Sequence, residues 1–292
     1  MDYQAFLTDQ QLDSEYLVTA LKWFKPLGDE IAVHHNGASN PFYVGINGAQ
    51  GSGKSTLAAF LDFYLSQVKG LNVVRLSLDD FYLSQSDRLA LSVKIHPLLK
   101  TRGVPGTHNM PLMNKTLERL KEYGTVSIPR FNKATDNPYP VLEWPIVNSP
   151  VDIVIFEGWC WGTRAQANAQ LNTPINTLEA EEDALGVWRN YINEQLAEAY
   201  EPIYALMDYW VMLRAPSFNC VEGWRIEQEH KLAARTAGVE QSAIMTDQQV
   251  KAFVSYFQRL TEHTLATLPE HMNCVYQLNE QRQITSTQAE FL

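Results

Sequence analysis

The sequence has 292 residues, with 33 acidic and 23 basic side chains and a formal net charge of −10. A hydrophobic content of 45% and an aromatic content of 11% are enough for a buried core, which excludes disorder as the main state. The net negative charge argues against a nucleic-acid partner, because phosphate backbones repel an acidic protein. A local basic pocket for a small anion is still compatible with this charge.

The cysteines and the N-terminus favour a reducing compartment. Cys160, Cys220 and Cys274 are far apart and form no CxxC pair, so we expect neither structural zinc nor a disulfide framework. The chain starts without a basic flank or an apolar segment of the kind that directs export, and no apolar run reaches about 18 residues. We expect a cytoplasmic protein without a membrane partner.

The first part of the chain reads as a helix, a loop, a strand and a second helix. Apolar residues at helical spacing predict an amphipathic helix over 5–25, as part of an N-terminal region 1–40 that packs on the main domain. Residues 34–41 have the composition of a loop. A strand over 42–46 then ends in glycine, and a helix runs from Lys54 towards Gly70.

Further strands and helices alternate along the rest of the chain. The run at 151–156 is almost entirely β-branched, which is typical of a central parallel strand covered on both faces. The alternation predicts one α/β domain with a doubly wound sheet. The other predicted elements are strands over 73–78, 209–213 and 274–278 and helices over 112–123, 186–200, 218–237 and 246–268.

Three stretches do not fit this alternation. Residues 94–111 and 129–150 are rich in proline, and residues 163–185 form a polar insertion. Long irregular segments in a compact domain are more often functional loops than neutral connectors. We expect acceptor or lid loops in these three places.

A phosphate-binding motif connects the first strand to its helix. Residues 48–55 match G-x-x-x-x-G-K-[ST], in which backbone N–H groups and a helix N-terminus hold phosphate oxygens. Lys54 should reach the β and γ phosphates, and the Ser55 hydroxyl should ligate Mg²⁺. The motif predicts a P-loop NTPase-type three-layer sandwich with ATP at Gly48, Ala49, Gln50, Gly51, Ser52, Gly53, Lys54, Ser55 and Thr56.

Carboxylates follow two of the predicted strands. Glu157 ends the buried strand, where it could join the Mg²⁺ shell or merely cap a loop, whereas Asp152 lies at the opposite end of that strand. Asp79 and Asp80 follow the strand after the P-loop helix. A carboxylate there could accept the proton of an attacking hydroxyl, although a turn or a helix cap would use the same residues.

The motifs favour a kinase over a switch or a motor. Asn132-Lys133-Ala134-Thr135-Asp136 resembles the base-reading motif of GTPases, but its aspartate is one place too late and the motif precedes the Glu157 strand. A nucleic-acid motor should show basic and aromatic patches, which the acidic balance opposes. A kinase acting on a small acceptor fits best, with the acceptor held by the proline-rich loops.

Five segments, together with two aromatic residues, carry a resemblance to a known family. They are 77–83, 96–108, 156–159, 224–229 and 245–250, the last followed by Phe253 and Tyr256. The Arg-Gly-Val-Pro-Gly-Thr-His run at 102–108 is the most specific part, and the resemblance extends over roughly 42–280. These segments resemble the D-glycerate 3-kinase family, which is related to uridine kinase, phosphoribulokinase and pantothenate kinase.

The resemblance implies ATP- and Mg²⁺-dependent phosphorylation of a small hydroxyl acceptor, D-glycerate above all. It implies that Asp79 is the base, that Glu157 has the metal role and that Arg225 is a lid residue that closes on the phosphates. An acid acceptor needs cations, and the forked guanidinium of Arg102 suits a carboxylate best. The full set of expected acceptor contacts is Asp80, Tyr82, Arg102, His108, Arg130 and Lys133.

The chain also departs from the family pattern near the expected acceptor pocket. Asn109 and Asn132 stand where aspartates are usual, and residues 134–140 replace a stretch rich in Gly, Asp and Arg. The sequence therefore leaves other readings open: a uridine- or pantothenate-kinase-like acceptor, or a nucleotide-binding regulatory protein without acceptor chemistry. It makes no prediction about the oligomeric state.

Overall fold

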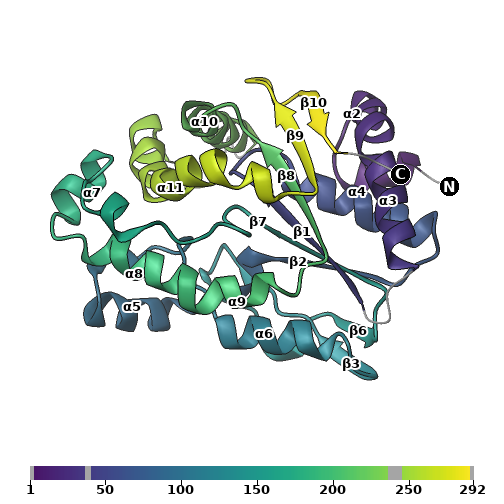
Figure 1. The fold of residues 1–292 in the computed structure, drawn as a ribbon, viewed down its shortest axis with the longest axis horizontal. Helices are drawn as coiled ribbons and strands as arrows, with labels where there is room; N and C mark the ends of the chain where they lie inside the picture. Colours follow the sequence, from purple (N-terminus) through teal and green to yellow (C-terminus); the bar gives the residue numbers. More distant parts are fainter. Residues whose placement is uncertain (1–2, 37–40, 236–244, 290–292) are drawn as a thin grey trace.

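The computed structural model describes residues 3–36, 41–235 and 245–289, which are built around one six-stranded sheet (Figure 1). Five strands are parallel, and the last strand adds to the edge antiparallel. The predicted, mostly parallel α/β sheet is thereby confirmed. In spatial order the strands are β10 (Ile284–Gln288), β9 (Cys274–Leu278), β8 (Tyr209–Arg214), β1 (Phe42–Gly48), β7 (Ile153–Gly158) and β2 (Val73–Ser77).

The sheet is covered on both faces because its central strands are apolar on both sides. In β7, Ile153 and Ile155 pack into one core, while Val154 and Phe156 pack into the other. The first core is closed by α3 (Lys25–His35) and α4 (Lys54–Gln67). The second is closed by α6 (Met110–Arg119), α8 (Val187–Gln195) and α9 (Glu201–Tyr204), as Figure 1 shows.

The long predicted helices are present with small changes in their bounds. α10 (Phe218–Arg235) and α11 (Asp247–Thr267) match the predicted segments, although 236–237 lie outside the described residues. The helix predicted over 186–200 is α8, extended by a π-helical turn over Leu196–Tyr200. Within the ranges that the structure describes, we find no helix with the length and hydropathy needed to span a bilayer.

The N-terminal region differs from the expected single helix. Gln11 adopts a left-handed φ of 54° between α1 (Tyr3–Asp9) and α2 (Ser14–Thr19), and the Asp13 carboxylate caps α2 by accepting from Tyr16 N at 3.0 Å. A left-handed residue followed by a cap ends one helix and starts another. The chain then stays helical to His35, so the predicted loop begins too early. Its residues 37–40 lie outside the described part.

Short paired strands lie within and next to the irregular stretch 129–150. β3 (Gly124–Ser127) pairs with β6 (Ile146–Ser149), and β4 (Phe131–Asn132) pairs with β5 (Asn137–Pro138). Neither pair of strands is predicted, because these strands are too short for a periodic pattern. Prediction also misses α5 (Gln85–Lys94) and the edge strand β10.

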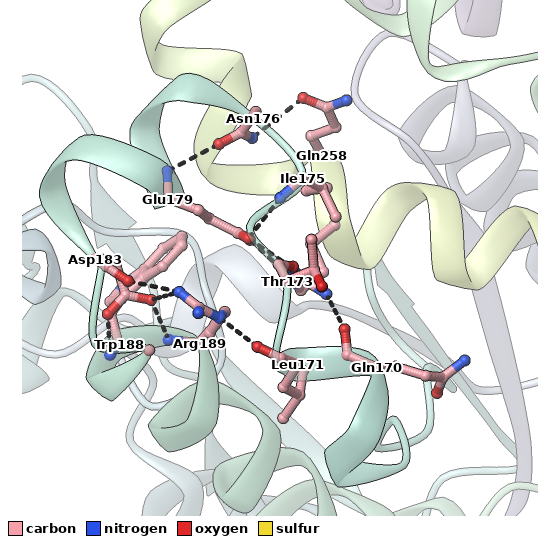
Figure 2. A network of polar contacts seen from close by, with 12 residues as sticks. Gln170, Leu171, Thr173, Ile175, Asn176, Glu179, Asp183, Trp188, Arg189 and Gln258 are labelled. Atoms are coloured by element: carbon pink, nitrogen blue, oxygen red, sulfur yellow. Dashed lines mark hydrogen bonds and ion pairs between the residues drawn. The ribbon is translucent and has the colours of Figure 1, made fainter.

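Buried ion pairs hold the polar insertion 163–185 against the helices (Figure 2). Arg259 of α11 donates from Nε and Nη2 to the two oxygens of Glu179 in α7 (Thr177–Glu182), at 2.7 and 2.6 Å. Arg189 of α8 binds Asp183 at 3.0 Å. Because buried charges must be paired, these contacts give the insertion a structural role.

Candidate active site

The P-loop is a tight turn with glycines where the backbone requires them. Gly51 and Gly53 have φ values of 78° and 93°, and a Cβ on Gly51 would lie 3.0 Å from the Cβ of Trp224 in α10. The side-chain oxygens of Gln50 and Ser52 are buried and have no hydrogen-bond partner within the described part of the chain. Such orphaned groups are rare in native structures and are expected where a ligand completes the hydrogen bonding.

Glu157 lies beside the P-loop because β7 runs parallel to β1. The Ser55 hydroxyl donates to Glu157 Oε1 at 2.8 Å, and Lys54 Nζ lies 4.0 Å from Oε2. Oε2 is buried and accepts no hydrogen bond from any described residue. Carboxylate and hydroxyl oxygens are the ligands that Mg²⁺ prefers, so this pair fits an ion that also keeps waters and phosphate oxygens.

Asp79 lies in a 3₁₀ turn over Leu78–Phe81, directly after β2. The Tyr82 hydroxyl donates to Asp79 Oδ1 at 2.9 Å, and Lys133 Nζ lies 2.6 Å from Oδ2. Burial raises the pKa of the Asp79 carboxyl, but the charges of Lys133 and Lys54 outweigh burial, so the pKa falls below its usual value. The carboxylate is therefore held in the ionised form that a general base needs.

The neighbouring Asp80 has a different environment. Its Oδ2 accepts from Ser77 N at 3.3 Å to complete a capping box, and it pairs with Arg130 Nη1 at 3.0 Å. Burial raises the pKa of Asp80, and Arg130 opposes the rise. Asp80 therefore has the alternative role that the sequence allows for these aspartates, because it caps a turn, and it also pairs with Arg130.

A cleft of about 1150 Å³ joins these groups. Lys54, Ser55 and Glu157 lie on its wall together with two further sets of residues. One set includes Gln11, Leu12, Tyr16, Thr19, Gln281, Arg282 and Gln283, and the other includes Asp79, Tyr82, Arg102, Lys133, Trp159, Phe253 and Phe257. Asp80, Arg130 and His108 are not among the described residues that line this cleft.

Arg102 reaches the cleft from the proline-rich loop but is already paired. Its Nη1 donates to Oδ1 of Asp136, and its guanidinium lies 5.7 Å from the ring centroid of Phe131. Asp136 has a left-handed φ of 55° and also pairs with Arg88. The sequence pattern gives no sign that Asp136 or Arg88 pairs near Arg102, because the contacts join separate segments of the chain and the only motif that contains Asp136 is the rejected GTPase-like one.

His108 corrects one expectation. The ring is almost fully buried, accepts or donates at Nδ1 with the Tyr200 hydroxyl at 2.6 Å, and stacks on Tyr82 at 4.6 Å. Burial lowers its pKa to about 3, so the ring is neutral. A buried neutral ring cannot provide a positive charge for an acid acceptor, and His108 instead supports Tyr82.

α10 brings Arg225 to the cleft and Trp224 to the core. Arg225 Nη1 lies 2.7 Å from Glu229 Oε2, and its side chain lines the cleft. Trp224 is buried against the P-loop and donates from Nε1 to the carbonyl of Glu280 at 2.6 Å. The helix therefore presents Arg225 to the P-loop side of the cleft.

Comparisons with known proteins agree with this arrangement. The model of the Phosphoribulokinase / Uridine kinase family matches residues 43–162. The uncharacterized kinase mug58 of Schizosaccharomyces pombe is 34% identical over 250 residues, which is 80% of this chain and 85% of that protein. The chloroplastic D-glycerate 3-kinase of Arabidopsis thaliana is 29% identical over 87% of this chain and 54% of its own length. The solved D-glycerate 3-kinase of Cryptococcus neoformans has a TM-score of 0.74 and 26% identity, with 93% of this chain and 99% of that chain covered.

Proposed function

Because the chain belongs to the phosphoribulokinase and uridine kinase family, as an ATP-dependent small-molecule kinase of the D-glycerate 3-kinase type, we propose that its acceptor is a small hydroxy acid. D-glycerate, converted to 3-phosphoglycerate, is the acceptor we propose first. The observation that carries the proposal is one cleft lined by Lys54, an ionised Asp79 and Arg102.

The nucleotide would bind at the P-loop end. Backbone N–H groups and Lys54 hold its phosphates, and the orphaned oxygens of Gln50 and Ser52 lie in the same loop. Ser55 and Glu157 would hold Mg²⁺, which neutralises phosphate charge when bound. The nucleoside would bind at the set that includes Leu12 and Tyr16, because the Tyr16 hydroxyl donates to the Thr56 carbonyl at 3.3 Å, directly after the P-loop.

The acceptor would bind at the Asp79 end. Arg102 pairs with its carboxylate, and Asp79 takes the proton of the hydroxyl as that oxygen forms its bond to the γ-phosphorus. The bond from the γ-phosphorus to the bridging oxygen breaks, and ADP leaves with the electron pair. Tyr82 and Lys133 hold the two oxygens of Asp79 in position.

Most of the rate enhancement would come from positioning and charge neutralisation. Phosphoryl transfer spreads negative charge over the equatorial oxygens of the transferred group, so cations at fixed positions stabilise it. Lys54 and Arg225 are the cations proposed for this task. Arg225 would then exchange its pairing with Glu229 for the phosphates when the cleft closes.

An acceptor screen tests the proposal. ADP release is measured with ATP, Mg²⁺ and one acceptor at a time, beginning with D-glycerate and including uridine and pantothenate. We expect D-glycerate or a closely related hydroxy acid to give the highest kcat/KM, and Lys54→Ala to abolish that release. Tight ATP binding without stimulation by any acceptor would instead identify a nucleotide-binding regulatory protein.

A further inference from the structure

The loop between β4 and β5 holds Asp136 in an unusual conformation. Its φ of 55° is a backbone conformation that few residues other than glycine adopt, although aspartate and asparagine tolerate it best. Such a conformation persists only where surrounding contacts hold it. Those contacts are two arginines, one on each carboxylate oxygen.

Arg88 fixes Asp136 from the interior. Its side chain is 0% exposed, and Nη2 donates both to Asp136 Oδ2 and, at 3.4 Å, to the Asp136 carbonyl. Nη1 donates to the Leu83 carbonyl at 3.4 Å. A buried guanidinium needs an opposite charge, and Asp136 is the carboxylate that pairs with it in the described structure.

Asp136 in turn fixes Arg102 at the cleft. It binds Nη1 of Arg102 through Oδ1, and the Phe131 ring lies under the same guanidinium at 5.7 Å. The Nε and Nη2 groups of Arg102 have no hydrogen-bond partner in the described part of the chain. These two N–H groups form the edge of a guanidinium that binds a carboxylate with two parallel hydrogen bonds.

The cluster also has a defined charge. Two arginines and one aspartate leave a single net positive charge, which matches one carboxylate. A second negative charge on the acceptor would meet both the Asp136 carboxylate and Asp79. The hairpin that carries Asp136 also carries Lys133, which binds Asp79 at 2.6 Å, so one short segment sets charges at both ends of the acceptor region.

We propose that Asp136 is a positioning and specificity-determining residue, which orients Arg102 and restricts the site to hydroxy acids with one negative charge. The inference rests on the proposed function, since it takes the acceptor to be an acid bound by Arg102. It assigns a role to the segment 134–140, where the sequence departs from the pattern of the family it resembles.

The test is Asp136→Asn in the full chain. Asparagine keeps the size and tolerates the left-handed backbone, but it removes the charge. With the best acceptor of the screen, we expect the acceptor KM to rise about tenfold or more while the KM for ATP stays within about twofold, because the bidentate contact is loosened. We also expect kcat/KM for malate or tartrate relative to a monocarboxylic hydroxy acid to rise about tenfold. Glu143→Gln removes an exposed carboxylate from the segment that follows β5 and should change neither ratio.

A double-mutant cycle with Arg102→Gln separates positioning from a structural role. If Asp136 acts through Arg102, adding Asp136→Asn to Arg102→Gln should raise the acceptor KM no further. Two results would overturn the inference: effects of the two substitutions on the acceptor KM that multiply in the double variant, or an equal rise of the acceptor KM and the KM for ATP in Asp136→Asn. A lower melting temperature of Asp136→Asn would not change this conclusion. A wild-type enzyme that phosphorylates no hydroxy acid would sink the proposed function itself, whereas an active wild type with multiplicative effects would sink this inference alone.

Discussion

The two halves that we propose for the cleft, a phosphate half at residues 48–56 with Glu157 and an acceptor half at Asp79 and Arg102, are built in different ways. The phosphate half is built mainly on one continuous loop, in which Gly51 and Gly53 have φ values of 78° and 93° and backbone groups form the site, and Glu157 is added to it from β7. The acceptor half is made by side chains from separate segments: Lys133 meets Asp79 across 54 positions, and Arg102 meets Asp136 across 34. A site made of consecutive backbone can be recognised from a short motif, whereas a site made of distant side chains cannot.

The halves also differ in how their polar groups are satisfied. Gln50, Ser52 and Glu157 each leave a buried oxygen without a hydrogen-bond partner among the described residues. In the acceptor half, Asp79 and Arg102 each pair with a residue of the β4–β5 segment. The phosphate half is therefore ready for its ligand, while the acceptor must compete with or extend existing ion pairs.

Asp79→Asn should have the largest effect and should act on one half alone. The amide cannot accept the hydroxyl proton, so we expect kcat to fall by about 10²–10⁴. ATP affinity should stay within about threefold of wild type, because the P-loop contacts are untouched. Turnover by coupled ADP release and binding of ATP by calorimetry measure the two effects.

Asp80→Asn is the matched control, since it removes the adjacent carboxylate. Asp80 caps the 3₁₀ turn and pairs with Arg130, so its loss should lower the free energy of unfolding by about 1–2 kcal/mol. Turnover should fall far less than in Asp79→Asn. Equal losses of turnover in the two variants would remove the distinction between base and cap.

Glu157→Gln should affect the phosphate half through the metal. The variant keeps a hydrogen-bond acceptor for Ser55 but loses the charge that faces the ion, so we expect the Mg²⁺ concentration for half-maximal activity to rise about 10–100-fold. The acceptor KM at saturating Mg²⁺ should stay near that of wild type. An unchanged Mg²⁺ requirement would show that Glu157 does not hold the ion.

Burial also explains which parts of the fold can be predicted from the sequence. The parallel strands β1, β7, β8 and β9 can be predicted because their apolar runs are mostly buried. The edge strand β2 is recognisable from its alternation, since Val74 and Leu76 are buried while Arg75 is exposed. The antiparallel edge strand β10 is missed, since Ile284 and Thr287 are only half-buried, the other three residues are exposed, and the apolar pattern is weak. In the N-terminal region, the left-handed Gln11 and the Asp13 cap interrupt a periodicity that otherwise reads as one helix.

In the candidate site, the sequence does not predict which side chains pair with one another. The sequence indicates Arg102 as a candidate acceptor contact but gives no sign that Asp136 pairs with it, and it offers His108 as a cation although burial keeps the ring neutral. Both outcomes depend on tertiary burial and on contacts between distant segments. Residue type alone therefore indicates which groups could bind an acid, and the fold decides which of them are charged and accessible.

Arg102→Lys should sharpen the comparison at the acceptor half. Lysine keeps the charge but lacks the fork, so we expect the acceptor KM to rise about tenfold, while the KM for ATP remains near that of wild type. Arg164→Lys is a suitable control, because Arg164 is exposed and lies outside the main cleft. A rise in the KM for ATP as large as that for the acceptor would mean that the two halves are not separate.

Lys133→Met should have the smallest effect, which is a shift of the pH dependence of kcat/KM. Burial raises the pKa of Asp79, and Lys133 is the largest of the charges that lower it. Without that charge, burial is opposed less, so the pKa rises. Because the base works only when ionised, activity is lost as pH falls through its pKa, and the acid limb of log kcat/KM should therefore move to higher pH.

Two variants complete this test of Asp79. Lys133→Arg keeps a positive charge beside Oδ2 and should leave the acid limb where it is, whereas Lys115→Met removes an exposed charge on α6 and should also leave it unchanged. His108 is neutral, with a pKa of about 3, so no limb near the usual histidine pKa should come from it. An acid limb that stays in place in Lys133→Met would mean that the titrating base is not Asp79, and the acceptor half would then lack the group on which its chemistry depends.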